Sequence, residues 1–217
     1  IAISGGSGSA PPIKDIKVLN ATSEELARWI IDAPANYGTS SLHAKTPKFE
    51  LDFTQKYTVG FDGLGSMQIR QTVTTKQSNQ EIAHKSAIAS TVRLSDIDLT
   101  GIVVEQIYLD DAIYGFLKAT AAISPEQVTA LRYTEPAWFA SSSDGHKIAQ
   151  WAVKLRTAGG RPVIQTDIFP ATEGGAPSTT PSPAPPQTAT QFVFTSEEAA
   201  RKAAEVLTQM VKKMMGG

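Results

Sequence analysis

The sequence predicts an α+β fold, in which an antiparallel β meander or partly open barrel of seven to nine strands is closed by a C-terminal amphipathic helix. Three observations support this prediction. From about residue 48, apolar and polar residues alternate, which is the period of half-buried strands. The connections between successive runs are short, which excludes parallel crossovers for most of the sheet. The chain ends in a strongly patterned helix of roughly 19 residues.

The start of the chain divides into a linker and a first helix. Residues 1–12 are rich in glycine and serine and are expected to form a flexible linker. Residues 13–217 are expected to form a single α+β domain. One extra N-terminal helix is predicted to begin at Thr22, which forms a capping box with Glu25, and to end at Pro34.

The strands follow from alternation and turn signals. The first long strand carries two apolar sets, and a slip near Gln55 is expected to bring them onto one face: Phe49, Leu51, Phe53 and Tyr57, Val59, Phe61. The glycine-rich turn at 62–65, followed by alternation over 66–76, predicts a hairpin. Further strands are predicted within 86–99, 100–111, 113–123 and 137–170.

The last part of the chain combines a loop and a helix. Residues from about 172 to 190 are rich in Pro, Ser and Thr and are predicted to form a disordered loop. The final helix is predicted to start with a capping box of Thr195 and Glu198. Its apolar positions recur at spacings of three and four: Ala199, Ala200, Ala203, Val206, Leu207, Met210, Val211 and Met214. This stripe predicts packing against the chain's own sheet, in preference to a partner helix or a membrane.

The order of many strands before one C-terminal helix, with the closing run FVFTSEEAARKAAEVL (192–207), resembles the pleckstrin-homology-like (PH-like) barrel. The resemblance covers roughly residues 48–215 and implies a helix that plugs one open end of a bent sheet. It also implies a platform that different members use for lipids, peptides or proteins. The early helix, the extra strands and the Pro-rich loop depart from this pattern. The alternative is a helix-grip fold, with an apolar cavity between a curved sheet and the last helix.

Composition excludes several classes of function. The chain has no cysteine, which excludes disulfides, thiol catalysis and iron–sulfur clusters. A net charge of −1, without long basic runs, argues against nucleic-acid binding. No stretch of 18 apolar residues occurs, so membrane insertion is not expected. The absence of cysteine is compatible with a bacterial secreted protein, and the abundance of Ser and Thr favours an extracytoplasmic (periplasmic or secreted) location. The first residues are then a signal remnant or a linker.

Ionisable residues form two weak constellations. Glu81 and His84 have the i, i+3 spacing of di-iron ligands, but a second such pair is absent. Asp96 and Asp98 would share one face of a strand, where paired carboxylates can bind calcium or perform acid–base catalysis. Solvated turn and strand-end positions are the favoured interpretation of both constellations. The sequence therefore predicts no catalytic residue, no cofactor and no metal ion, and an enzyme built from Asp96, Asp98 and His84 is the third hypothesis.

Aromatic residues mark the candidate interaction surface. Trp138, Phe139 and Trp151 flank a hairpin predicted at Asp144 and Gly145. They are either core residues or an exposed platform for a partner. The leading hypothesis is a non-enzymatic binding or scaffold domain whose partner is an unknown protein. The alternative is a carrier of a small apolar ligand, of the helix-grip type.

Overall fold

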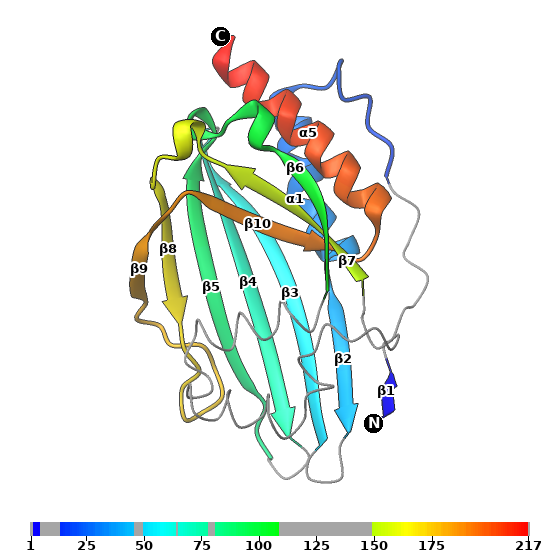
Figure 1. The fold of residues 1–217 in the computed structure, drawn as a ribbon, viewed down its shortest axis with the longest axis vertical. Coiled ribbons are helices and arrows are strands. Elements are labelled where there is room, and N and C mark those ends of the chain that lie inside the picture. Colours follow the sequence, from blue (N-terminus) through cyan, green and yellow to red (C-terminus); the bar gives the residue numbers. More distant parts are fainter. Residues whose placement is uncertain are drawn as a thin grey trace.

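The chain folds as an α+β protein with two antiparallel sheets, as the sequence predicts (Figure 1). The computed structural model describes residues 2–4, 14–45, 50–63, 65–77, 81–108 and 149–216. Within these ranges, the α-helices are α1 (Ser23–Tyr37) and α5 (Glu197–Met215). The strands form two separate sheets and do not close into a barrel.

The larger sheet has seven strands in the order β1-β2-β3-β4-β5-β8-β9. Their bounds are β1 (Ala2–Ser4), β2 (Ser40–Lys45), β3 (Glu50–Asp62), β4 (Ser66–Gln77), β5 (His84–Arg93), β8 (Ile164–Phe169) and β9 (Ser182–Gln187). The predicted hairpin is confirmed as β3–β4, and its register runs without interruption from Leu51↔Gln77 to Asp62↔Ser66. The slip expected near Gln55 is therefore wrong. The step from Phe53 to Tyr57 is even, so the apolar face continues through a buried Gln55.

The smaller sheet has the order β10-β7-β6 and crosses in front of the upper half of the larger one (Figure 1). Its strands are β6 (Val103–Tyr108), β7 (Ala149–Arg156) and β10 (Ala189–Phe194). Short 3₁₀ turns at one end of the molecule are η1 (Leu94–Asp96), η2 (Leu99–Gly101) and η3 (Ala158–Gly160). The strand expected over 86–99 therefore ends at Arg93.

The predicted start of helix α1 at Thr22 is confirmed, but its predicted end at Pro34 is wrong. The Glu25 amide donates to Thr22 Oγ1 (3.2 Å), and the Thr22 amide donates to Glu25 Oε2 (2.8 Å). Pro34 does not stop the helix, which continues to Tyr37. The last turn persists because Tyr37 is buried in the core, and the Gly38 amide closes the turn on the Pro34 carbonyl (2.8 Å).

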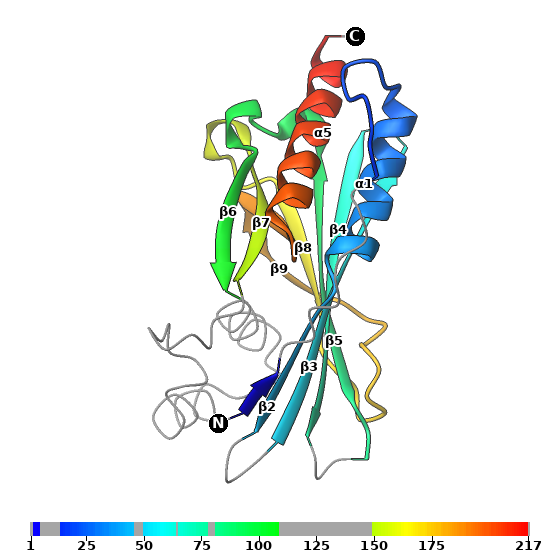
Figure 2. The same ribbon diagram turned by 90° about the vertical axis from the view of Figure 1, so that its right-hand side faces the viewer.

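Helix α5 lies between α1 and the smaller sheet and contacts both (Figure 2). All the predicted stripe positions are buried except Met214, which is 39% exposed. The predicted capping box is displaced by one residue. The Ala199 amide donates to Ser196 Oγ (3.3 Å), which makes Ser196 the N-cap. Thr195 donates instead to the Tyr37 carbonyl, through its amide (2.8 Å) and its hydroxyl (3.0 Å).

The loop expected over about 172–190 is wrong from Ser182 onwards, because this part contains strand β9 and the start of β10. β9 is an edge strand, the position in a sheet where prolines are tolerated. It pairs Thr166↔Ala184 and Ile168↔Ser182, and its register shifts near Pro185. The preceding turn is also anchored, since the Lys85 amide donates to the carbonyl of the buried Gly175 (2.7 Å). Removing residues 174–188 would therefore delete an edge of the sheet.

Candidate functional site

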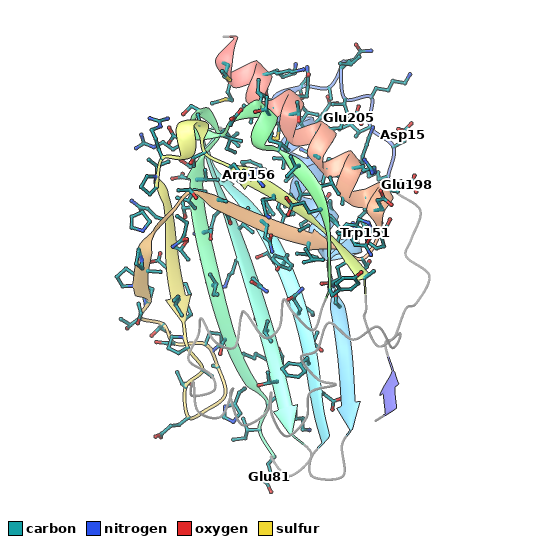
Figure 3. All side chains as sticks on the ribbon, in the orientation of Figure 1. Asp15, Glu81, Trp151, Arg156, Glu198 and Glu205 are labelled. Atoms are coloured by element: carbon teal, nitrogen blue, oxygen red, sulfur yellow. The ribbon has the colours of Figure 1, made fainter. Side chains whose placement is uncertain are left out.

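The predicted aromatic surface is only partly described. Trp138 and Phe139 lie outside the described residues, as do Asp144 and Gly145 of the expected hairpin. Trp151 lies on β7, where it pairs with Phe194 of β10 and Gln106 of β6 (Figure 3). It is half-buried and packs against the core. Trp151 therefore helps to join the smaller sheet to the rest of the molecule.

The structure does not bring the predicted ionisable residues together. Glu81 and His84 lie at one end of β5, with Glu81 at the tip of the sheet (Figure 3). Asp96 and Asp98 follow the other end of this ten-residue strand, about 30 Å away at 3.3 Å per residue. Among the described residues, no group of three or more potential ligands could hold a metal ion.

The two aspartates have local structural partners. Asp98 is the N-cap of η2, and its Oδ1 accepts from the Thr100 hydroxyl (2.8 Å) and the Thr100 amide (2.9 Å). These bonds hold the pKa of Asp98 below its usual value. Asp96 forms an ion pair with Arg161, 3.4 Å from Oδ1 to Nη2. Both carboxylates therefore stabilise the local structure around η1 and η2 at this end of the molecule.

A surface groove runs between the segment 14–21, α1 and α5. It consists of two adjoining pockets of about 460 and 470 Å³, which share Lys14 and Asp15. The first pocket lies against α1, and the second reaches Glu198 and Glu205 of α5 (Figure 3). Each volume is within the usual range of about 300–1,000 Å³ for ligand pockets.

Two hydrogen bonds hold the wall of the groove in place. Trp29 Nε1 donates to the Lys14 carbonyl (2.9 Å), and the Lys14 amide donates to the Tyr37 hydroxyl (3.2 Å). Trp29 is only 5% exposed, so its ring is fixed by packing. The wall therefore has a rigid aromatic support from α1.

The first pocket combines an apolar floor with a charged rim. Ile16, Ala21 and Trp29 line its floor. Among the described residues, the side chains of Lys17 and Arg28 on its rim have no ion-pair partner. Lys14, at the junction with the second pocket, is likewise unpaired in the described structure. Cationic groups on the rim are therefore available to a ligand.

The carboxylates around the groove are divided between bound and free groups. Glu25 accepts the capping hydrogen bond from Thr22, and Glu205 pairs with Lys202 (3.0 Å). Asp15 and Glu198 have no ion-pair partner among the described residues and lie towards α5. The end of the groove at α1 is therefore the more cationic one.

A buried polar network joins the two sheets. Gln71 Nε2 donates to Gln55 Oε1 (2.9 Å), and Gln55 Nε2 donates to Gln150 Oε1 (3.4 Å). Gln150 Nε2 then donates to Ser40 Oγ. Gln55 is 0% and Gln150 is 1% exposed, so these amides depend on one another for hydrogen bonds. The network fixes β7 of the smaller sheet against β2, β3 and β4.

Tyr57 is buried close to this network, and its hydroxyl has no hydrogen-bond partner among the described residues. It is 3% exposed and lies opposite Gln71 in the β3–β4 pair. In the described structure, no hydrogen bond reaches its hydroxyl. Burial raises the pKa of Tyr57, because the phenolate would be poorly solvated.

We expect Tyr57→Phe to leave stability at neutral pH unchanged or to raise it by up to about 1 kcal/mol, because an unsatisfied buried hydroxyl is removed. The raised pKa makes wild-type stability fall as the pH rises above about 10, where the unfolded chain ionises this tyrosine. The variant should lack this part of the decline. Denaturant unfolding of both proteins at neutral and alkaline pH measures the difference. An identical alkaline decline in both would contradict the assignment.

Three side chains on the buried face of α5 are closely packed in the described part of the chain. Ala203, Val206 and Leu207 on its buried face are 0% exposed. A water-sized void in contact with them would have given them accessible surface. The cavity expected for a helix-grip carrier therefore does not touch these side chains.

No protein-family model, curated protein or solved structure matches this chain. The resemblance to PH-like barrels therefore stays a prediction. None of the described helices is long and apolar enough to cross a membrane.

The groove cannot be predicted from the sequence because its parts are distant along the chain. Lys14, Arg28 and Glu198 belong to three separate segments, and no spacing rule connects them. One local signal was present, since Trp29 lies on the apolar face of a capped helix. This signal indicates that the helix is packed against something, but it does not indicate that segment 14–21 lies there.

Proposed function

We propose that this chain is a non-enzymatic binding domain that holds an acidic segment of a partner protein in the groove along α1. One observation carries the proposal, namely an apolar floor beside Lys14, Lys17 and Arg28, which have no ion-pair partner among the described residues. Apolar side chains of a peptide would cover Ile16 and Trp29, while its carboxylates would approach the rim. Hydrogen bonds between charged groups are stronger than those between neutral groups, so they contribute more to the free energy of binding.

The rigid support of the groove favours binding without rearrangement. Because Trp29 is packed and hydrogen-bonded, the floor needs no ordering when a ligand arrives, which reduces the entropy lost on binding. The proposal places the domain outside the cytoplasm of a bacterium, on the basis of composition alone. The apolar-ligand carrier has less support, because Ala203, Val206 and Leu207 on the buried face of α5 have no accessible surface.

The test uses a fluorescein-labelled peptide of alternating Glu and Leu, with its binding followed by fluorescence anisotropy. We expect saturable binding that weakens with salt, because the rim charges are exposed. The double variant Lys17→Gln/Arg28→Gln should raise Kd about tenfold or more, which corresponds to about 1.4 kcal/mol. A peptide of alternating Lys and Leu should not bind.

The matched control is Lys212→Gln/Lys213→Gln. It removes the same charge from the last turn of α5, outside the residues that line the groove. If both double variants raised the peptide Kd equally, the effect would come from the overall charge of the protein and not from the groove. Absence of binding by the wild-type chain would refute an acidic peptide as the ligand.

A further inference from the structure

The groove along α1 and α5 changes in charge from one end to the other. In the first pocket, the cations are Lys14, Lys17 and Arg28. The carboxylates there are Asp15 and Glu25, and that of Glu25 accepts the capping hydrogen bond of α1. Cations therefore outnumber carboxylates in this pocket, and the end of the groove at α1 attracts anions.

The charges that α5 contributes to the second pocket are mostly paired within the helix. Lys202 pairs with Glu205 (3.0 Å), and Arg201 pairs with Glu197 (2.6 Å). These two cations lie three and four residues after Glu198, where helical geometry would place a partner for its carboxylate. Because both cations are taken, Glu198 has no ion-pair partner among the described residues.

Asp15 adds a second unpaired carboxylate to this pocket from the segment 14–21. It is exposed and has no ion-pair partner in the described structure. Figure 3 shows Asp15 and Glu198 on the same flank of α5. Once the ion pairs within α5 are set aside, two carboxylates and the single cation Lys14 remain. The end of the groove at α5 is therefore anionic.

A cationic side chain matches these two carboxylates better than a metal ion does. Among the residues that the structure describes, no group of three or more potential ligands could hold a metal ion. A lysine or arginine side chain can pair with one carboxylate while its apolar stem lies along the protein surface. The anionic end of the groove therefore suits a basic residue of a ligand.

The second pocket is long enough for a separate part of a bound peptide. Its wall on α5 extends from Glu198 to Glu205, which is about 10 Å along the helix at 1.5 Å per residue. An extended peptide covers this length with about three residues. A segment that fills both pockets therefore places different residues at the two ends of the groove.

We infer, on the basis of the proposed function, that the partner segment held in the groove is bipolar, with acidic residues against α1 and basic residues against α5. A uniformly acidic segment would bring carboxylates towards Asp15 and Glu198, and this repulsion would weaken its binding. Basic residues at that end replace the repulsion by attraction. The order of charges thereby selects among acidic partners and fixes the direction in which the segment lies.

The test compares fluorescein-labelled peptides of equal length by fluorescence anisotropy. Each bipolar peptide has a Glu-Leu half and a Lys-Leu half, and its reference has Gln in place of Lys. Both orders of the two halves are made, so that either chain direction is represented. We expect one order to bind at least about threefold more tightly than its reference at low ionic strength, because exposed charge pairs contribute modestly. Salt should reduce this advantage.

The double variant Asp15→Asn/Glu198→Gln should abolish the advantage of the bipolar peptide without raising the Kd of the Gln reference. The matched control is Glu81→Gln/Glu173→Gln, which removes the same charge at exposed positions outside the groove. It should retain the advantage. Circular dichroism confirms that both variants are folded.

The outcomes separate a bipolar segment from a merely acidic one. If a Gln reference binds and Lys17→Gln/Arg28→Gln weakens it, but neither bipolar peptide binds more tightly, the groove holds an acidic segment and the bipolar pattern is wrong. An advantage that survives in Asp15→Asn/Glu198→Gln, or that the control removes equally, would also overturn the bipolar pattern. If no peptide binds, the proposed function fails together with it.

Discussion

Leu207→Ala is expected to lower the free energy of unfolding by about 2–4 kcal/mol. Leu207 is 0% exposed and lies in the middle of the buried stripe of α5. The neighbouring strands belong to sheets and cannot collapse into the space that the side chain leaves. The loss therefore includes a cavity term in addition to the lost transfer free energy. Urea unfolding of the purified variant and the wild type measures this loss as a shift in the urea concentration at the midpoint of unfolding.

The matched control is Lys212→Ala, on the exposed side of the same helix. It shortens a side chain in the last turn and should change stability by no more than about 0.5 kcal/mol. A Leu207→Ala variant as stable as this control would contradict the packed interface. It would then favour a helix that serves a partner.

The capping and periodicity of both helices could be predicted because these signals are local. Thr22 and Glu25 satisfy each other across three residues, and the stripe of α5 needs only its own sequence. The error at Thr195 has a tertiary cause. Thr195 and Ser196 are both good N-caps, and the bonds of Thr195 to Tyr37 decide between them.

The Pro-rich segment shows where composition misleads. Prolines prevent a segment from forming a sheet on its own, which suggests disorder. An edge strand, however, needs hydrogen bonds on one side only, and β8 offers a preformed partner. Ser182, Ala184 and Gln187 still have amide hydrogens within β9. The sequence alone does not say that β8 lies beside this segment.

The buried glutamine network cannot be predicted from local sequence either, because its partners are distant along the chain. A polar residue inside an apolar series suggested a slip in the strand at Gln55. The series in fact continues, and Gln55 is tolerated because Gln71 and Gln150 supply its hydrogen bonds. Gln150 is 95 residues away along the chain, so no local pattern contains the pairing.

Gln55→Glu should lower stability at neutral pH by about 3–5 kcal/mol, the usual effect of an uncompensated buried charge. The new carboxylate could still accept from Gln71, but it would have no hydrogen to donate to Gln150 Oε1, which lies 3.4 Å from the amide nitrogen that it replaces. If the Gln150 amide turned round, it could donate to the carboxylate and accept a hydrogen bond from the Ser40 hydroxyl. The carboxylate would still be a charge at a fully buried position, without an ion-pair partner among the described residues.

The dependence on pH identifies this mechanism. Burial raises the pKa of the introduced carboxyl in the folded state above its unfolded value of about 4.3. The penalty therefore grows as the pH rises above about 4.3, and it shrinks in acid, where the protonated acid can donate to Gln150. The matched control is Gln68→Glu, at an exposed position of β4, where the carboxylate remains hydrated and the loss should be small. Denaturant unfolding of both variants at neutral and mildly acidic pH separates the cases. A loss for Gln55→Glu that is independent of pH would mean that the site admits water, and the network would then not be the dry link between the two sheets.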